Sequence, residues 1–498
     1  MNDAADGYRT DIGYTYGYHP ELNPLRLRLA FLNAGLKVPT IASACELGFG
    51  QGISIAIHAA ASPIHWHGTD INPDHAAFAR QLAAASGAEL GLFDNSFAEF
   101  AARPDLPAFD YIGLHGVWSW ISDRNRAAIV SFVERKLRPG GVLYVGYNAQ
   151  PGWAAFVPIR HLLVEHANRA GGEGRDIAHR IDDAVNFLAR LLATETAFAR
   201  ENPRILPSVK LLEESDRRYL AHEYFNRDWQ PMHFATVADW LAPAKLCYVC
   251  SADFAEHVDA LSLSAAQRSL IKEIREPRLR ESVRDFIANP IFRRDYWAKG
   301  VEPISAADRA EALRRERVIF VEHAGELPFK LRAALALREA ELGDAVSAAI
   351  LKILGDRKAW SVGEIERAFK PRDVSLDRIA DIVFLIASCG LIQAAQDDAV
   401  SARIRSRTDR LNAWSIDRAR VGRDMPDLAS PVTGGGIAVG RIEQLFLFAL
   451  RHGKTRPEEW AHEASKFVTT EQAAVDLTGQ AQSFAEKRLP TLRALQIV

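Results

Sequence analysis

Short apolar runs alternate with longer stretches of helical periodicity in the first third of the chain. The apolar runs cover Ile41–Leu47, Pro63–Thr69, Glu89–Phe93, Phe109–Leu114 and Val142–Val145. Helical stretches separate them, including Ile53–Ala61, a helix starting at Asn72-Pro73, and Asp123–Leu137. Continuous apolar runs of this length are typical of strands buried on both faces of a parallel sheet. The pattern therefore predicts an α/β fold with a doubly wound, Rossmann-like sheet.

A glycine-rich loop follows the first predicted strand. It reads Glu46-Leu-Gly-Phe-Gly-Gln-Gly, with glycines at Gly48, Gly50 and Gly52. Glycines let the backbone turn sharply and let a ligand lie against bare main chain. The spacing is neither the dinucleotide fingerprint G-x-G-x-x-G nor a P-loop. An acid at position 46 suits a cofactor that carries a cation, as the sulfonium and ammonium of S-adenosylmethionine do, although a solvent-facing strand end stays the alternative.

Acidic and polar residues follow the next two strands, where they would meet the rest of such a cofactor. Asp70 ends the second strand and is predicted to accept the ribose hydroxyls, with Ile71 beside it. Asp94 and Ser96 follow the third strand, where an adenine amino group would find its acceptor. For Asp94 the alternative is an ordinary helix N-cap.

Aromatic and polar residues follow the fourth and fifth strands: His115, Trp118, Trp120, Tyr147, Asn148 and Trp153. Ligands of open α/β sheets bind at the carboxyl ends of strands, so we expect these residues to border the reacting groups. The residues to which we assign catalytic roles are His115, Trp118, Tyr147 and Asn148. His115 also counts among the cofactor contacts, and a general base or a packed strand-end histidine both fit it.

The chain resembles a known family at this point. The motifs that carry the resemblance are the Glu46–Gly52 loop, Asp70, His-Gly-Val-Trp-Ser-Trp from His115, Leu-Arg-Pro-Gly-Gly from Leu137, Tyr-Asn-Ala-Gln-Pro-Gly-Trp from Tyr147, Tyr219–Asn226, Trp229–Met232, Ser430–Gly434 and Arg441–Phe446. They resemble class I S-adenosylmethionine-dependent methyltransferases, in the bacterial branch with a methyltransferase regulatory domain. That branch includes rickettsial protein-lysine methyltransferases that modify an outer-membrane protein. The resemblance implies S-adenosylmethionine as cofactor and a protein lysine as acceptor.

Aromatic side chains suit a lysine acceptor. An amphipathic channel would hold the lysine stem and favour its nitrogen by cation–π contact. The residues predicted to bind substrate in this way are Tyr14, Tyr16, Tyr18, Trp118, Trp120 and Trp153. Simple packing of several of these rings is the alternative. The place after the fourth strand reads His-Gly-Val-Trp rather than an Asn/Asp-Pro-Pro-Tyr box, which disfavours methylation of exocyclic amines or amides.

Composition narrows the choice of partners. The 498 residues include 61 Lys and Arg against 63 Asp and Glu, with no basic block, which argues against a nucleic acid partner. No apolar stretch approaches the roughly 18 residues of a membrane span, and the polar start does not look like a signal peptide, so we expect a cytoplasmic protein. Cys247 and Cys250 are three apart in a strand-like run, where their thiols would diverge, and we predict no metal site.

The later chain predicts further modules. Residues 156–221 would be a helical insertion, interrupted at 171–174, that serves as a dimerisation element or a lid. Helices and a short strand between Leu331 and Ala394 suggest a winged-helix-like unit for substrate-protein docking rather than DNA binding. The expected divisions are 1–155 core, 156–221 insertion, 222–258 closing helix and strand, 259–400 helical winged-helix-like domain, and 401–498 mostly helical C-terminal domain with a last helix over Thr470–Leu489.

Three functions remain open from the sequence. The favoured one is a protein methyltransferase acting on lysine, as a monomer or a homodimer. A methyltransferase for a small molecule or a cell-envelope precursor is the second, and a non-catalytic cofactor-binding scaffold is the third. Glu46 and Asp70 argue against the scaffold, since a protein that has lost cofactor-dependent activity need not retain these acidic residues.

Overall fold

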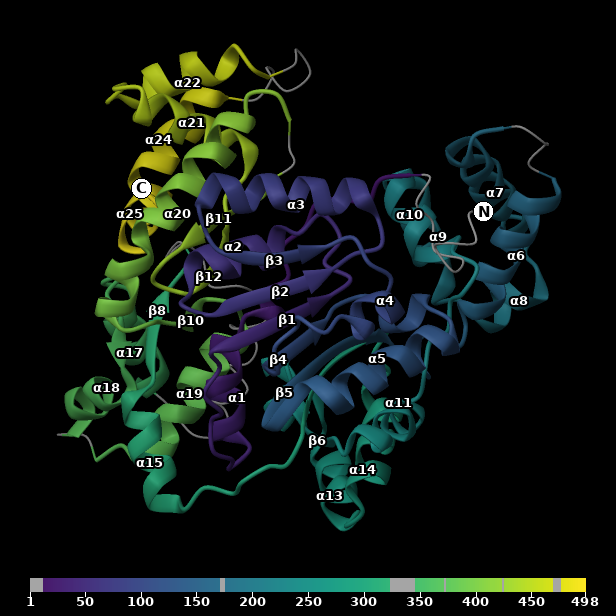
Figure 1. The fold of residues 1–498 in the computed structure, drawn as a ribbon, viewed down its shortest axis with the longest axis horizontal. Helices are drawn as coiled ribbons and strands as arrows, with labels where there is room; N and C mark the ends of the chain where they lie inside the picture. Colours follow the sequence, from purple (N-terminus) through teal and green to yellow (C-terminus); the bar gives the residue numbers. More distant parts are fainter. Residues whose placement is uncertain (1–11, 171–174, 323–344, 371–372, 423–424, 469–475) are drawn as a thin grey trace.

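A seven-stranded sheet forms the centre of the molecule (Figure 1). The computed structural model describes residues 12–170, 175–322, 345–370, 373–422, 425–468 and 476–498. The sheet order is β3-β2-β1-β4-β5-β7-β6. Its strands are β1 Ser43–Leu47, β2 His65–Thr69, β3 Leu90–Phe93, β4 Phe109–Leu114, β5 Leu137–Asn148, β6 Cys247–Ser251 and β7 Phe292–Ala298. β7 is antiparallel to both β5 and β6, and the other pairs are parallel, which confirms the doubly wound Rossmann-like sheet.

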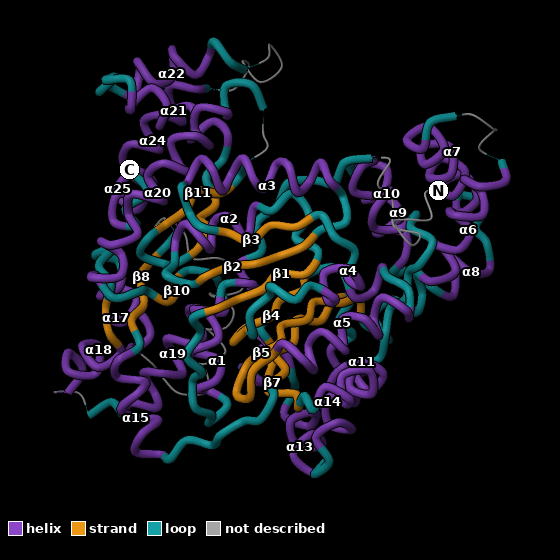
Figure 2. Tube along the Cα trace, viewed as in Figure 1, coloured by secondary structure: helices purple, strands orange, loops and turns teal. Residues whose placement is uncertain are grey.

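Helices cover both faces of the sheet, as Figure 2 shows with the strands in orange. The helices of the core are α1 Leu27–Asn33, α2 Ile53–Ala61, α3 Pro73–Ser86, α4 Phe97–Ala102, α5 Asp123–Lys136 and α11 Phe234–Leu241. Ala44, Tyr111 and Tyr144 pack with Ile55 and Ala59 of α2. The strand neighbours Cys45 and Ile112 belong to the cluster of α4, α5 and α11. Successive strand residues thus point to opposite faces, and both faces are apolar, as the unbroken apolar runs predicted.

Strand β7 lies inside the stretch that the sequence pattern assigned to a helical domain. Its sequence, Phe-Arg-Arg-Asp-Tyr-Trp-Ala, carries three charges and does not look like a buried strand. Two of those charges, Arg293 and Asp295, are buried and paired with each other. The core therefore extends to Ala298 rather than ending near residue 258. A 3-10 helix at Phe254–His257 and three α-helices fill the connection between β6 and β7: α12 Asp259–Ser262, α13 Ala265–Glu273 and α14 Pro277–Ala288.

A helical insertion follows β5. Its helices are α6 Val157–Arg169, α7 Ile177–Leu192, α8 Ala197–Glu201, α9 Ile205–Glu214 and α10 Arg217–Tyr224. They share a core of their own, which includes Leu163, Val185, Val209 and Leu220 and also takes in Trp153. The expected boundary at residue 221 falls within α10, and the expected interruption at 171–174 lies outside the described residues.

In the part of the next unit that the structure describes, a small three-stranded antiparallel sheet is accompanied by four α-helices. The sheet order is β10-β8-β9. Its elements are α15 Ala306–Arg315, β8 Arg317–Phe320, α17 Ala345–Leu354, β9 Trp360–Ser361, α18 Val362–Phe369, α19 Leu376–Ser388 and β10 Ile392–Ala394. This agrees with a winged-helix-like unit, although its expected start at Leu331 lies outside the described residues. In Figure 1 the unit lies across the sheet from α10.

The C-terminal part packs on the helices behind the glycine-rich loop. Its elements are α20 Asp398–Arg418, β11 Asp427–Ser430, β12 Gly435–Ala438, α21 Arg441–Arg451, α22 Pro457–Ser465, α24 Leu477–Ser483 and α25 Leu489–Ala494. The first residues of the helix expected from Thr470 lie outside the described ranges. Leu411 of α20 shares a buried cluster with Ile53 and Ile57 of α2 and Leu82 of α3. Within the described ranges, no helix is both long and apolar enough to cross a membrane.

Candidate functional site

A cavity of about 390 Å³ opens at the carboxyl ends of β1 to β4. Its wall comes from segments far apart in the sequence: the N-terminal segment at Tyr14–His19, the loop after β1, the ends of β2 to β5, α10, and the start of β7. In a parallel sheet these strand ends lie at one edge, so the topology brings the predicted residues together.

The glycine-rich loop takes left-handed backbone conformations. The φ angle is +72° at Gly48 and +56° at Gly50, values that residues with a Cβ rarely adopt. A Cβ on Gly48 would also lie 2.6 Å from a methyl group of Val117. Gly52 precedes α2 at φ +74°, and a Cβ there would collide with Ala79 of α3. Gly48 and Gly50 thus line the cavity, whereas Gly52 serves the packing of α2 against α3.

Glu46 is a buried acid in the wall of the cavity. Its side chain is 3% exposed, and its Oε2 atom has no hydrogen-bond partner among the described residues. Burial, and then the charge of Asp70, raises the pKa of Glu46 to about 8. A carboxyl group held in this way gains most from a cationic ligand, because the cation restores the charged form that burial disfavours.

Asp70 ties the loop to the end of β2. Its Oδ2 accepts a hydrogen bond from the Gly50 N–H at 2.8 Å. Its Oδ1 accepts one from the Asn72 N–H at 3.0 Å and lies 3.1 Å from His75 Nδ1. A carboxylate offers about four acceptor positions. Asp70 lines the cavity as predicted, but room remains for roughly one further hydrogen bond rather than for a pair of ribose hydroxyls.

After β3, the residue that lines the cavity is one position later in the chain than the predicted Asp94. Asp94 lies outside the cavity wall and pairs with Arg80 at 3.4 Å, with both side chains about half exposed. Asn95 lines the cavity, and its Oδ1 is buried without a hydrogen-bond partner among the described residues. Ser96 and Ile71 also line the cavity, and Ser96 caps α4 together with Glu99. Asn95 rather than Asp94 therefore offers the free acceptor here.

Three of the aromatic residues predicted to bind substrate are part of the cavity wall. Tyr14, Trp120 and Trp153 all border the cavity. Hydrogen bonds fix the two indoles: Trp120 Nε1 donates to the Glu223 carbonyl at 2.9 Å, and Trp153 Nε1 donates to the Ile291 carbonyl at 2.6 Å. Tyr14 lies edge-on to His222, with ring centroids 5.1 Å apart. These rings are held in place before any ligand arrives.

Tyr16 and Tyr18 face away from the cavity, contrary to the prediction. Tyr16 packs edge-on against Phe78 of α3, and the Tyr18 hydroxyl lies 3.0 Å from His58 Nε2 of α2. The intervening residues Thr15 and Gly17 face the cavity. Repeated tyrosines along this segment thus divide between the site and the core, which the sequence did not reveal.

Trp118 and Tyr147 also lie away from the cavity, so their positions support neither the catalytic roles predicted for both nor the substrate binding predicted for Trp118. Trp118 is fully buried and packs edge-on against Trp240. Tyr147 donates a hydrogen bond to Asp295 at 2.8 Å. It points to the face of β5 opposite to that of Asn148, because neighbouring strand residues alternate. Only Asn148 of that pair reaches the cavity.

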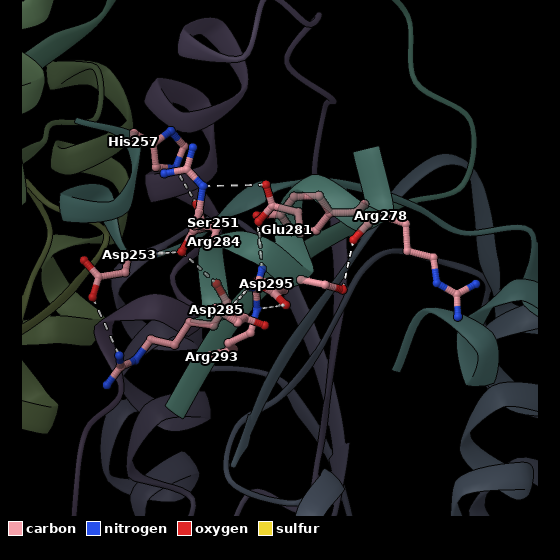
Figure 3. A network of polar contacts seen from close by, with 12 residues as sticks. Ser251, Asp253, His257, Arg278, Glu281, Arg284, Asp285, Arg293 and Asp295 are labelled. Atoms are coloured by element: carbon pink, nitrogen blue, oxygen red, sulfur yellow. Dashed lines mark hydrogen bonds and ion pairs between the residues drawn. The ribbon is translucent and has the colours of Figure 1, made fainter. Parts of the chain in front are cut away.

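Behind Tyr147 lies a buried ionic network (Figure 3). Arg293 contacts the carboxylates of Glu281, Asp285 and Asp295, all of them buried. Glu281 and Asp285 come from α14, and Asp295 from β7. The network joins α14 to the sheet next to the cavity and accounts for two of the three charges in β7, Arg293 and Asp295.

His115 lines the cavity as a neutral ring. Its Nδ1 lies 2.7 Å from the Tyr144 hydroxyl, and it stacks on His19 with centroids 4.0 Å apart. Burial, then His19 and Arg294, lowers the pKa of His115 well below its ordinary value. An imidazole of such low pKa is a weak base, so the position favours the packed histidine over the general base.

Several wall residues were not assigned to the site from the sequence, chiefly Tyr219, His222 and Glu223 of α10, together with Asn95, His19 and Arg294. Glu223 lies 3.4 Å from Asn148 Nδ2, and burial raises its pKa to about 7. Arg294 pairs with Glu21 at 3.2 Å. The signal for α10 was present: residues 219–226 combine aromatic rings, a histidine and an acid in one short stretch.

Comparisons with known proteins agree with this geometry. A family model described as a methyltransferase domain matches residues 44–141, and one described as a predicted methyltransferase regulatory domain matches residues 216–299. The second range begins at the N-cap of α10 and ends after β7. An uncharacterized protein of Synechocystis sp. is 34% identical over 99% of both chains, and one of Rickettsia prowazekii is 26% identical over 41% of this chain and 39% of its own.

Among solved structures, PKMT2 from Rickettsia typhi in complex with AdoHcy shares the fold across 97% of this chain and 99% of that chain. The TM-score is 0.67 and the identity 18%. The fold, the glycine-rich loop and the full-length relative from Synechocystis sp. all indicate the same family. The chain belongs to the class I S-adenosylmethionine-dependent methyltransferases that carry a methyltransferase regulatory domain.

Proposed function

We propose that this protein transfers a methyl group from S-adenosylmethionine to a lysine side chain of another protein. The observation that carries the proposal is the set of aromatic side chains, Tyr14, Trp120 and Trp153, that line the same cavity as the glycine-rich loop. Aromatic faces hold the apolar stem of a lysine and favour its cationic or partly positive nitrogen.

The cofactor side of the cavity fits S-adenosylmethionine. Among the described residues, Glu46 Oε2 and Asn95 Oδ1 have no hydrogen-bond partner, so Glu46 can receive a cationic group and Asn95 the adenine amino group. Asp70 has room for one ribose hydroxyl. The bound cofactor supplies a methyl group on a sulfonium. The side chains described here would bind and align the reactants and exclude water, which an in-line displacement needs more than acid–base chemistry.

The comparisons support both halves of the proposal. The solved PKMT2 structure was obtained with AdoHcy, the product left after methyl transfer, and its fold matches nearly the whole chain. The sequence resemblance to rickettsial protein-lysine methyltransferases supports the choice of acceptor.

A second acceptor class has one observation in its favour. Arg294 places a guanidinium in the wall, beside Phe292 and next to Glu21. A small molecule or cell-envelope precursor that carries a carboxylate or phosphate would use this cation. The pairing of Arg294 with Glu21 reduces what it can offer, so the lysine acceptor is preferred.

The test follows the methyl group. The protein is incubated with isotopically methyl-labelled S-adenosylmethionine and a bacterial cell extract, and labelled residues are identified by mass spectrometry. Label on protein lysines is the expected result. Label only in small molecules, or only on carboxyl or hydroxyl groups, would contradict the lysine proposal. In calorimetry, Asp70→Asn should weaken S-adenosylmethionine binding, while the matched Asp94→Asn outside the wall should not.

A further inference from the structure

Glu223 is a carboxyl group whose position the fold does not explain. It lies in the last turn of α10, where the helix dipole disfavours a negative charge. Among the described residues, no Lys, Arg or His lies within ion-pair distance of it, and its one side-chain hydrogen bond comes from Asn148. A buried acid without a cation is costly, so a cationic ligand is the natural partner.

The surroundings of Glu223 suit an alkylammonium group. Its own backbone is fixed, because its carbonyl accepts the Trp120 indole N–H. The titratable groups that face it are Tyr14 of the N-terminal segment and Tyr219 and Tyr224 of α10. Burial raises the pKa of all three hydroxyls, that of Tyr14 to about 12. Near neutral pH these rings stay uncharged, and Glu223 is the group among them that changes its charge.

Resting on the proposed function, we infer that Glu223 binds the ammonium group of the acceptor and takes up one of its protons before methyl transfer. The proton passes from nitrogen to the carboxylate, leaving a neutral amine and a carboxylic acid. The nitrogen lone pair then forms the new N–C bond as the methyl–sulfur bond breaks, and that bond's electron pair stays on sulfur. Burial favours the proton transfer, because it raises the pKa of a carboxyl group and lowers that of an ammonium group.

Asn148 is a positioning residue in this scheme. Its amide N–H group donates to Glu223, and its own backbone N–H is held by the Ser119 hydroxyl at 2.8 Å. One oxygen of Glu223 is thereby oriented while the other is left for the ammonium group.

A binding experiment tests the inference without knowledge of the natural substrate. The probes are n-butylammonium, which copies the lysine side chain, and n-butanol, its neutral counterpart, titrated by NMR into the full chain with S-adenosylhomocysteine present. For the wild type, n-butylammonium binding should fall about tenfold per pH unit once the pH is below about 7, while n-butanol binding should not change. Equal pH dependence for both probes, or no n-butylammonium binding, would overturn the inference.

Variants separate charge from structure. Glu223→Gln should weaken n-butylammonium binding at least tenfold at pH 8, remove its pH dependence and leave n-butanol binding unchanged. Glu223→Asp keeps the charge and should keep the pH dependence. Glu214→Gln, an exposed acid on α9, is the control and should behave as the wild type. Unchanged ammonium binding by Glu223→Gln would exclude Glu223 even if the extract experiment labels protein lysines, so the two proposals fail separately.

Methylation rates provide a second measurement once a labelled protein is in hand. With wild type, kcat/KM should rise with pH to a plateau set by Glu223. With Glu223→Gln it should rise about tenfold per pH unit towards the lysine pKa near 10.4, since only the rare neutral amine then reacts. A structural defect would lower the rate without changing this slope, and identical profiles would contradict the proton transfer.

Discussion

At the scale of single residues, the cavity contains two carboxyl groups that burial pushes toward neutrality. Burial raises the pKa of Glu46 to about 8 and that of Glu223 to about 7. Glu46 lies in β1 and Glu223 in α10, and both line the cavity. Each is poised to become charged when a cation enters, which suits a site that receives a sulfonium cofactor and an ammonium acceptor.

Glu46→Gln should change cofactor affinity and stability in opposite directions. In the wild type, S-adenosylmethionine binding should strengthen as the pH rises from about 6 to 8, because the carboxylate form binds the cation. The glutamine variant should lose that dependence in calorimetry. A binding curve that keeps its pH dependence would contradict the role of Glu46.

The sign for stability follows from the raised pKa. An acid whose pKa is higher in the folded state stabilises the protein below its ordinary pKa, and this contribution is lost as the pH rises through the folded value, here about 8. Thermal unfolding of ligand-free protein should therefore show Glu46→Gln to be more stable than the wild type at pH 8 to 9. Equal melting temperatures there would count against a buried, unpartnered Glu46.

Asn95→Ala should weaken binding of adenosine-containing ligands by about tenfold, the usual worth of one hydrogen bond of roughly 1 kcal/mol or slightly more. The comparison is S-adenosylhomocysteine affinity in Asn95→Ala and in Asp94→Ala. A larger loss of S-adenosylhomocysteine affinity in the Asp94 variant would instead support the prediction from the sequence that Asp94 binds the adenine amino group.

Sequence reasoning reached the loop, Asp70, Trp120 and Trp153 because strand order brings strand ends together, and it reached Tyr14 as one of the tyrosines of the N-terminal segment. It missed by one residue at Asp94, since the pattern does not tell which of two adjacent polar residues turns inward. It placed Tyr147 in the site because neighbouring residues of β5 point to opposite faces of the sheet. The sequence does not tell which of these faces borders the cavity. Glu223 escaped because α10 approaches the cavity only through tertiary packing.

At the scale of elements, β7 depends on ion pairing for its place in the sheet. Arg293 faces Tyr147 across the β5–β7 pair and meets three buried carboxylates (Figure 3). Alternation and hydrophobicity could not predict this strand, because its charges are neutralised by residues of α14 that lie just before it in the chain.

Arg293→Met should destabilise the protein by about 3–5 kcal/mol, because three buried carboxylates would lose their cation. Arg175→Met is the control, as its pair with Asp183 lies at the surface and should contribute about 1 kcal/mol or less. Urea denaturation measures both. Similar losses in the two variants would argue that the network is no more important than a surface pair.

At the scale of the whole molecule, the C-terminal part and the cofactor loop share a core. Leu411 of α20 packs with Ile53 and Ile57 of the helix that begins at the loop. Arg410 donates to the Ser86 carbonyl at 2.7 Å, and Gln396 donates to the Ala61 carbonyl at 2.8 Å. Sequence patterns found these helices but not their packing partners, since the contacts join segments more than 300 residues apart.

Leu411→Ala should lower the free energy of unfolding by about 2–5 kcal/mol through the cavity it leaves. The unfolding transition should remain single, and S-adenosylhomocysteine should still raise its midpoint. Val421→Ala removes a side chain that is 83% exposed and should change stability by about 0.5 kcal/mol or less. Two separate transitions in Leu411→Ala would mean that the C-terminal part folds independently of the loop.

In Figure 1 the winged-helix-like unit lies across the sheet from α10, whose residues Tyr219, His222 and Glu223 line the cavity. A role in presenting a protein substrate stays a prediction. From this position it would have to act on a part of the substrate distant from the methylated lysine.

The wall of the cavity runs from Tyr14 near the start of the chain to Arg294 in β7. During synthesis, a chain that contains the glycine-rich loop but not yet α10 and β7 has only part of the cavity wall. The cavity wall is therefore complete only after nearly 300 residues have been synthesised and β7 has paired between β5 and β6.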